Sequence, residues 1–153
     1  MQNEIQEQKV LLERAGALLN SILDGLDGLD VETKKRIMEP CGEACARSDA
    51  DLEIASKIAE ATTDEEEILR RANDEIPWCG TWTREDDVIQ TTCASCGCPL
   101  VRSGVVRLSG TLCYCSTGWV RKIFETLLRR PVNVRLEESI GRGDQVCKFV
   151  VHT

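Results

Sequence analysis

The stretch that decides the fold is TGWVRKIFETLLRR (residues 117–130), followed directly by PVNVRLEESIGRGDQVCKFVV (residues 131–151). The first segment places six apolar side chains on one helical face: Trp119, Val120, Ile123, Phe124, Leu127 and Leu128. Pro131 ends the helix because proline has no amide hydrogen to donate. Apolar and polar residues then alternate over 132–137, and the run Val146–Val151 returns after two glycines. This pattern predicts one amphipathic helix packed on an antiparallel C-terminal hairpin.

The chain divides into two parts that differ in net charge. Residues 1–76 hold 19 acidic and 9 basic residues, a net of −10, whereas residues 77–153 hold 7 acidic and 10 basic residues, a net of +3. The first part predicts four helices: 3–24, 31–39 or longer, 50–61, and one that starts at a capping box formed by Thr63 and Glu66. The second part predicts a hairpin over 80–92 and short strands at Val105–Leu108 and Thr111–Cys115. We therefore expect a single α+β domain over residues 1–153, with an acidic helical part and a Cys-rich α+β part.

The composition excludes several classes of protein. A net charge of −7 with 4% aromatic residues argues against binding to nucleic acid. No apolar run approaches the length of about 20 residues that spans a membrane. The polar start MQNEIQEQKV is unlike a signal peptide. These features predict a soluble cytoplasmic protein.

Cysteine is the unusual component, with nine residues against a single histidine. Five lie close together: Cys93, Cys96 and Cys98, then Cys113 and Cys115. Four thiolates at about 2.3 Å form the usual tetrahedral site for zinc, so we expect these residues and Cys147 to be metal ligands. An iron–sulfur cluster is the alternative cofactor. Burial as small apolar side chains and disulfide or redox chemistry are the remaining interpretations of the cluster.

A second pair, Cys41 and Cys45, is spaced to lie on one helical face, one turn apart. The two thiols would share a metal ion, join the other cluster or form a redox pair. Pro40 and Gly42 predict that the helix bends or ends here. Cys79 carries no interpretable pattern, and His152 is expected to be solvated near the chain end. Cys115, placed just before the helix that starts at 117, is expected to have a lowered pKa.

The N-terminal segment repeats apolar residues every seven positions: Ile5, Leu12, Leu19 and Leu26. This stripe predicts either packing within the chain or the seam of a homodimer through the N-terminal helix.

Residues 113–151 resemble the C-terminal half of 4-vinyl reductase domains. The resemblance lies in Cys113 and Cys115 before Gly118-Trp119, the break at Pro131-Val132, and the hairpin from Glu138 to Phe149. It implies a small α+β module that senses a ligand or is associated with a metal. Ser139 stands where many members have the first hairpin cysteine, so a metal site would recruit another thiol. Gly118, Trp119 and Arg142 are candidate ligand-binding residues at the edge of a pocket.

The whole chain also resembles a group of small Cys-rich proteins, some of them named L-2-amino-thiazoline-4-carboxylic acid hydrolase. The combined expectation is a zinc-binding module for a small-molecule ligand. The alternatives are an iron–sulfur carrier, a thiazoline or amide hydrolase with a metal-bound water, and a thiol oxidoreductase. The catalytic residues stay unassigned.

Overall fold

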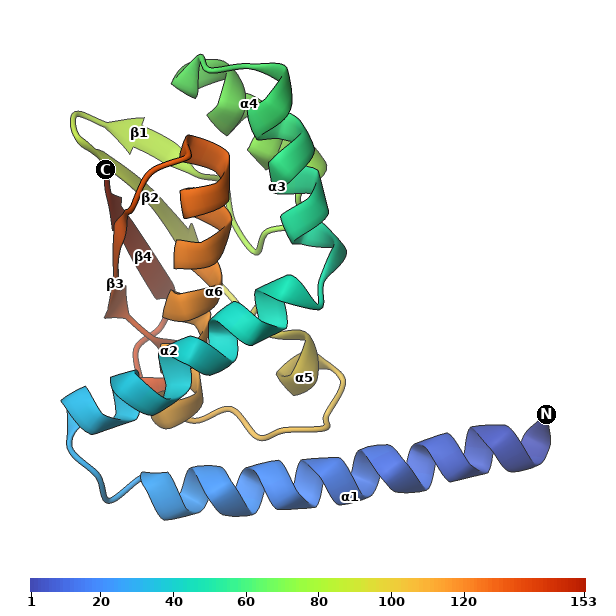
Figure 1. Cartoon of the computed structure of the whole chain (residues 1–153). Helices are drawn as coiled ribbons and strands as arrows, with labels where there is room; N and C mark the ends of the chain where they lie inside the picture. The colour runs from blue at the N-terminus through green and yellow to red at the C-terminus, as the bar shows by residue number, and fades with distance from the viewer.

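The computed structural model describes all 153 residues and packs helices against one face of an antiparallel sheet (Figure 1). The helices are α1 (Gln2–Leu26), α2 (Val31–Arg47), α3 (Ala50–Ala61), α4 (Glu65–Glu75), α5 (Pro99–Arg102) and α6 (Gly110–Leu128), with a 3-10 turn η1 (Ile140–Arg142). The strands are β1 (Thr83–Glu85), β2 (Val88–Cys93), β3 (Asn133–Glu138) and β4 (Cys147–His152). The predicted α+β class, with most helices first and a C-terminal hairpin, is confirmed.

The sheet has the strand order β1-β2-β4-β3, and every neighbouring pair is antiparallel. Val151 of β4 pairs with Ile89 of β2 on one side and Val134 of β3 on the other, and all three side chains are buried. Because side chains alternate between faces, Phe149 and Cys147 lie on this same inner face. The last strand of the chain is therefore the centre of the sheet.

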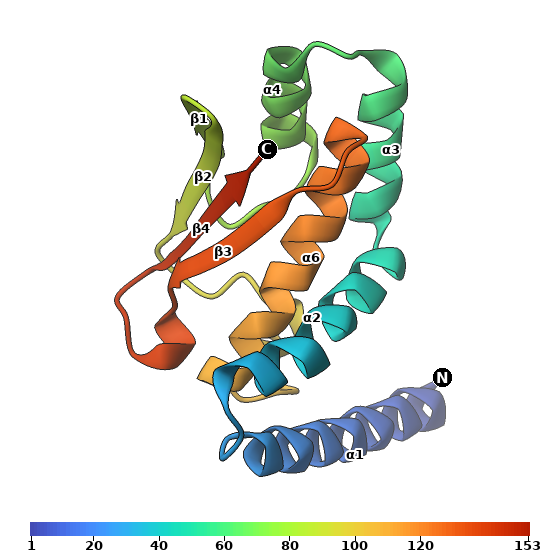
Figure 2. The same ribbon diagram turned by 60° about the vertical axis from the view of Figure 1, so that its left-hand side comes forward.

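Helix α6 lies between the sheet and the helices α2 and α3, as Figure 2 shows. Its side chains Ile123, Phe124 and Leu127 are at most 1% exposed. The ring centroid of Phe124 lies 4.7 Å from that of Trp82, which packs under the sheet. The other side of α6 meets α3, where Ile58 is fully buried in the same core. A helix covered on two sides needs apolar residues over most of its surface, as the sequence of α6 provides.

Glycines let α2 and α6 cross at very short range. A Cβ atom on Gly42 would collide with the carbonyl oxygen of Cys115 and lie 2.7 Å from the amide nitrogen of Trp119. A Cβ atom on Gly118 would collide with the carbonyl oxygen of Glu39 and lie 2.7 Å from its carbonyl carbon. Each helix thus contributes the glycine that admits the other backbone.

Helix α2, expected over 31–39 or longer, runs through Pro40 to Arg47, because packing against α6 outweighs one lost backbone hydrogen bond. Two local expectations differ from the structure, besides the strand expected at 111–115 that is described below. The N-cap of α4 is Asp64, whose carboxylate accepts hydrogen bonds from the amides of Glu66 and Glu67, in place of Thr63. Residues 105–108 form no strand.

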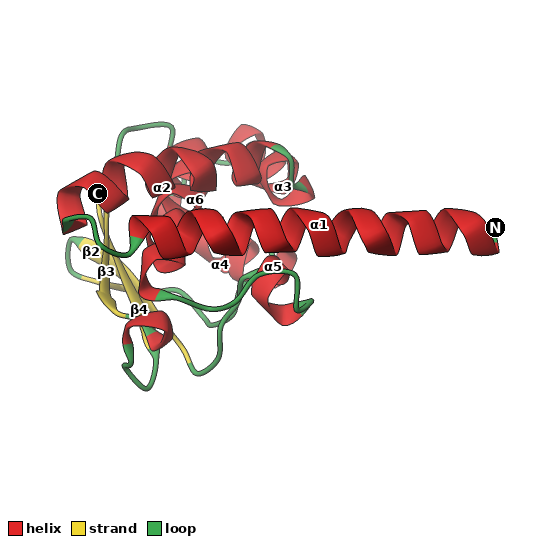
Figure 3. Cartoon of the chain, turned by 90° about the horizontal axis from the view of Figure 1, so that it is seen from below, coloured by secondary structure: helices red, strands yellow, loops and turns green.

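Helix α1 extends past the rest of the molecule, and its N-terminal half projects freely (Figures 1 and 3). Its inner face packs through Gly16 and Leu23, which are buried. Large apolar side chains on the rest of α1 are exposed: Ile5, Val10, Leu11, Leu12, Leu18, Leu19 and Ile22. No helix of the molecule combines the length and hydropathy needed to cross a bilayer.

We predict that Gly118→Ala lowers the free energy of unfolding by about 2 kcal/mol or more, because the added methyl group must push α2 away from α6. Chemical denaturation of both proteins measures the difference. Gly25→Ala is the matched control, since no atom lies within 4 Å of its Cβ position. That control should stabilise α1 by up to about 1 kcal/mol. Equal stability of Gly118→Ala and the parent protein would contradict the close crossing.

A separate contact ties α4 to the sheet. Glu65 pairs with Arg84 of β1 and with Arg130, which follows α6. The hydrogen bond from Arg130 holds the pKa of Glu65 below its ordinary value of 4.5, and the charges of Arg130 and Arg84 add to this against the effect of burial. A carboxylate with a depressed folded-state pKa stabilises the fold above its unfolded pKa and loses that contribution as the pH falls through the folded value.

We predict that Glu65→Gln destabilises the protein by about 0.5–1 kcal/mol at neutral pH, the range of partly exposed ion pairs. The difference from the parent protein should shrink below about pH 4.5, where the parent carboxylate becomes protonated. Denaturation midpoints across pH 3–7 test this. Glu60→Gln, an exposed residue of α3 without an ion pair, should show no such pH-dependent difference. A constant difference for Glu65→Gln at all pH values would contradict the assignment.

Candidate functional site

The helical phase of α6 decides where the central cysteines point. We expected a strand over 111–115 that turns Cys113 and Cys115 to one side, and this expectation is wrong. Ser109 caps α6 by accepting a hydrogen bond from the Leu112 amide at 3.2 Å, so the helix already begins at Gly110. Residues two apart on a helix are separated by about 200° around the axis. Cys113 therefore faces η1 and β4, whereas Cys115 faces α2.

Four unpaired thiols lie at or near the crossing of α2 and α6, and we call them the outer thiol group: Cys41, Cys45, Cys98 and Cys115. Cys41 and Cys45 are exposed and lie one turn apart on α2, as the spacing predicted. Cys115 lies against α2 because its backbone contacts Gly42. Cys98 is the residue before α5 and is half-buried. The structure thus brings together the two cysteine sets that are far apart in sequence.

The pKa of the outer thiols depends on burial and on neighbouring thiols. Burial raises the pKa of Cys115 to about 12, and the charges of Cys45, Cys98, Cys41 and Cys113 act in the same direction. Burial, followed by the charge of Cys98, also raises the pKa of Cys45. The lowered pKa expected for Cys115 is therefore wrong, because this thiol lies inside α6 and against α2. A cation among these sulfurs would relieve both effects.

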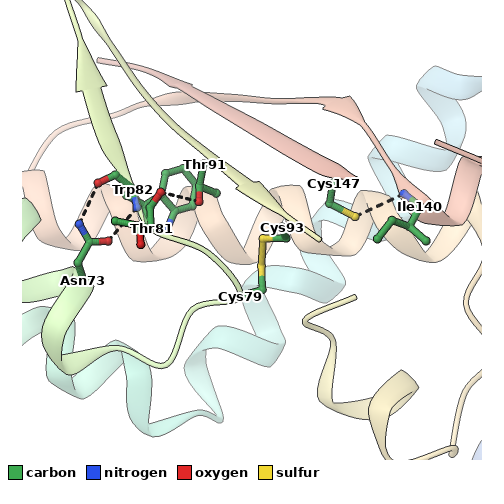
Figure 4. Close-up of a disulfide and its surroundings, with 8 residues drawn as sticks. All are labelled: Asn73, Cys79, Thr81, Trp82, Thr91, Cys93, Ile140 and Cys147. Atoms are coloured by element: carbon green, nitrogen blue, oxygen red, sulfur yellow. Dashed lines mark hydrogen bonds between the residues drawn. A yellow bond between two sulfur atoms is a disulfide. The ribbon is translucent and has the colours of Figure 1, made fainter. Parts of the chain in front are cut away.

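Three further thiols form the inner thiol group between α6 and the sheet: Cys96, Cys113 and Cys147. The sulfur of Cys113 packs on Gly141, 2.5 Å from the position that a Cβ atom would take there. The sulfur of Cys147 accepts a hydrogen bond from the Ile140 amide at 3.5 Å (Figure 4). Burial raises the pKa of Cys113, and the charges of Cys147 and Cys96 contribute to this.

Ser139 completes the inner thiol group. Its side chain is fully buried, and its hydroxyl has no hydrogen bond of standard geometry. The hydroxyl nevertheless lies near enough to Cys113 to lower the pKa of that thiol against the effect of burial. The residue that marks a departure from the 4-vinyl reductase pattern thus lies among the cysteines.

Two cysteines are joined as a disulfide, Cys79–Cys93, with their Cα atoms 5.4 Å apart (Figure 4). Cys93, an expected metal ligand, is therefore not a free thiol in this structure. Sequence reasoning found no role for Cys79, since its neighbours show no spacing motif. The only indication in the sequence was that Cys79 lies between Trp78 and Trp82, and both of these side chains pack into the core.

No group of three or more Cys, His, Asp or Glu side chains is arranged to hold a metal ion in this conformation. Zinc, the iron–sulfur alternative and the expected ligand set stay predictions. The single histidine, His152, lies at the end of β4 with its Nε2 atom 3.1 Å from the guanidinium of Arg135. It is remote from the thiols along β4, so any site here uses sulfur donors.

The three candidate ligand-binding residues are dispersed. Gly118 is buried in the helix crossing, and Trp119 packs its ring 5.6 Å from that of Trp78. Arg142 donates hydrogen bonds to the carbonyl oxygens of Leu136 and Glu137, each at 3.0 Å. The structure does not gather them around one pocket.

Two cavities lie away from the cysteines. One, of about 420 Å³, is an open groove beside β1 and β2 with only polar lining residues, among them Gln90 and Lys148. The other, of about 220 Å³, lies between the end of α1 and the segment before α6, where Asp24 pairs with Arg107 at 2.8 Å. Neither has a cysteine in its lining.

Comparison with known proteins places the chain in one group. No curated protein matches the sequence. A family model matches residues 12–152, which include all nine cysteines and every strand. The expected resemblances to 4-vinyl reductase domains and to thiazoline hydrolases stay predictions. By the extent of this match, the chain belongs to the family described as Family of unknown function (DUF6144).

Proposed function

We propose that this protein is a thiolate-based metal-binding module with zinc as its ion, and that it binds a small molecule at that ion in the cytoplasm. Cys45, Cys98 and Cys115 would hold the metal, and Cys41 would be an exchangeable fourth ligand. The observation that carries the proposal is the convergence of these thiols from α2, α6 and the loop before α5.

The donor set fits zinc. Thiolates bind zinc in tetrahedral sites, and the outer thiol group supplies four unpaired thiols. The carboxylates of Glu39 and Glu43 on α2 are already paired with Arg121 of α6. Gly42 sets the distance between α2 and Cys115. Since the side chains form no metal-binding arrangement in this conformation, the cysteines would have to turn toward a common ion.

The four thiols are not equivalent. Cys98 and Cys115 are half-buried, whereas Cys41 is exposed to solvent and its thiol donates a hydrogen bond to the Ile37 carbonyl oxygen at 3.3 Å. A ligand site held by three thiolates and one replaceable thiol would admit an external thiol or another soft donor. Zinc, when bound, would supply Lewis acidity toward that ligand.

A second copy of this chain is the partner that we propose for α1. The side chains of Ile5, Leu12 and Leu19 repeat every seven residues and are exposed. Helix α1, which carries them, extends past the body of the molecule (Figure 3). Two such stripes are self-complementary in shape, and each fully buried leucine would contribute roughly 1.5–3 kcal/mol. Acidic Glu4 and Glu7 near one end of the stripe and basic Lys9 and Arg14 nearer its middle favour an antiparallel pair.

We predict that protein purified without oxygen holds one zinc ion per chain and that Cys98→Ser or Cys115→Ser loses it. Elemental analysis combined with a thiol count measures both. Cys96→Ser is the matched control, because Cys96 lies on the same loop but belongs to the inner thiol group, and it should keep the metal.

The metal proposal has clear contrary outcomes. A parent protein free of metal, with all seven unpaired thiols titrating, would refute it. Detection of iron, acid-labile sulfide and visible absorbance would identify the cofactor as an iron–sulfur cluster and not as zinc. Loss of metal in Cys96→Ser with retention in Cys98→Ser would move the site to the inner thiol group.

We predict that the parent protein is a dimer and that Leu12→Glu with Leu19→Glu makes it a monomer, because two charges cannot be buried in an apolar seam. Light scattering coupled to size exclusion measures the mass. Ala17→Glu adds a charge on another exposed side of α1 and should leave the dimer intact. A monomeric parent protein, or a dimer in the double variant, would count against this partner.

A further inference from the structure

The disulfide has a free thiol directly across the sheet from it. Cys93 ends β2, Cys147 begins β4, and the two residues are direct register partners. Both side chains are buried on the inner face of the sheet. Figure 4 shows the Cys147 sulfur turned toward Ile140. Cys93 thus has two cysteine neighbours, Cys79 through the disulfide and Cys147 on the adjacent strand.

The backbone permits a bond to either neighbour. Directly opposed residues of antiparallel strands have Cα atoms about 4.5 or 5.5 Å apart. Disulfides span Cα separations of about 4.4–6.8 Å. The existing bond to Cys79 spans 5.4 Å, and register partners such as Cys93 and Cys147 fall in the same range. A change of the Cys147 rotamer would bring its sulfur toward Cys93.

We propose that Cys79, Cys93 and Cys147 form a thiol–disulfide exchange site in which Cys93 alternates between two partners. The Cys147 thiolate attacks the Cys93 sulfur, the Cys93–Cys147 bond forms, and the Cys79–Cys93 bond breaks. The electron pair leaves on the Cys79 sulfur, which takes up the proton that Cys147 has lost. No electrons enter or leave the protein, so the exchange needs no external oxidant.

Both ends of this exchange are held by local contacts in the present state. The Cys147 sulfur accepts a hydrogen bond from the Ile140 amide at 3.5 Å, which it gives up when it turns toward Cys93. The leaving residue, Cys79, lies in the segment between α4 and β1, outside any helix or strand, and its neighbour Gly80 packs closely on Thr92 of β2. None of its three cysteines belongs to the outer thiol group, so the exchange uses none of the proposed metal ligands.

Exchange would also alter the loop that holds Cys96 and Cys98. Gly97 of this loop packs on Cys79, because a Cβ atom there would lie 2.9 Å from the Cys79 Cβ and 3.2 Å from its sulfur. Release of Cys79 from Cys93 removes the tether under Gly97. The natural reagents for such a site are low-molecular-weight thiols and disulfides, which would trap one partner or the other.

The test maps disulfides in native protein that is quenched with acid, alkylated and cut with trypsin without reduction. Cleavage after Lys and Arg places Cys79 in peptide 72–84, Cys93 in 85–102 and Cys147 in 143–148. We expect the main linkage to join 72–84 with 85–102. After incubation at mildly alkaline pH without denaturant, a second linkage should join 85–102 with 143–148, together with alkylated Cys79.

Variants separate exchange from chance oxidation. Cys79→Ser treated with glutathione disulfide should form Cys93–Cys147 as its main internal bond, and Cys147→Ser should lose the second linkage. Cys113→Ser, which removes the other buried thiol of the inner thiol group, should retain it. Parent protein in which Cys147 stays fully alkylatable after incubation would overturn the proposal, as would pairing of Cys93 with Cys96 or Cys98 in Cys79→Ser.

Discussion

The close contact between α2 and α6 at Gly42 and Gly118 is the constraint on which the rest of the molecule depends. Each glycine occupies a place where any side chain would strike the backbone of the other helix. Because α6 also covers the sheet, a shift of α2 would be transmitted to the core on both of its sides. The crossing thus fixes the helical layer against the sheet, and it fixes the backbone positions of the cysteines that flank it.

Sequence patterns gave the parts of the fold that are periodic. The sequence predicted the apolar face of α6 and the alternation in β3 and β4. An element that is buried on one side repeats its apolar residues with the period of its secondary structure, so the period identifies it. The strand expected at 111–115 failed because its alternating residues also fit a helix, and the cap at Ser109 decided the outcome. The continuation of α2 through Pro40 depends on a tertiary contact with α6, which no local pattern can encode.

The candidate site could be predicted only in part, because it too depends on tertiary contacts. Spacing identified Cys41 and Cys45 as one helical face and the 93–98 loop as a dense cluster. It could not show that Cys115 turns toward α2 while Cys113 turns toward β4, because that division follows from helical phase. Nor could it pair Cys79 with Cys93, since a disulfide depends on Cα separation in space and not on sequence spacing.

Helix α6 separates the outer thiol group from the inner one, and this separation matters for metal binding and disulfide exchange. A thiolate that binds zinc is a poor nucleophile for a disulfide while the metal holds its charge, so metal binding and exchange need separate sulfurs. The turn of about 200° between Cys113 and Cys115 provides that separation within one helix. The loop at Gly97 also links the two groups, because Cys96 and Cys98 lie on either side of it and Cys79 packs against it. A change of disulfide partner at Cys93 would therefore reach the metal ligands through Cys98, while α2 and α6 stay in place.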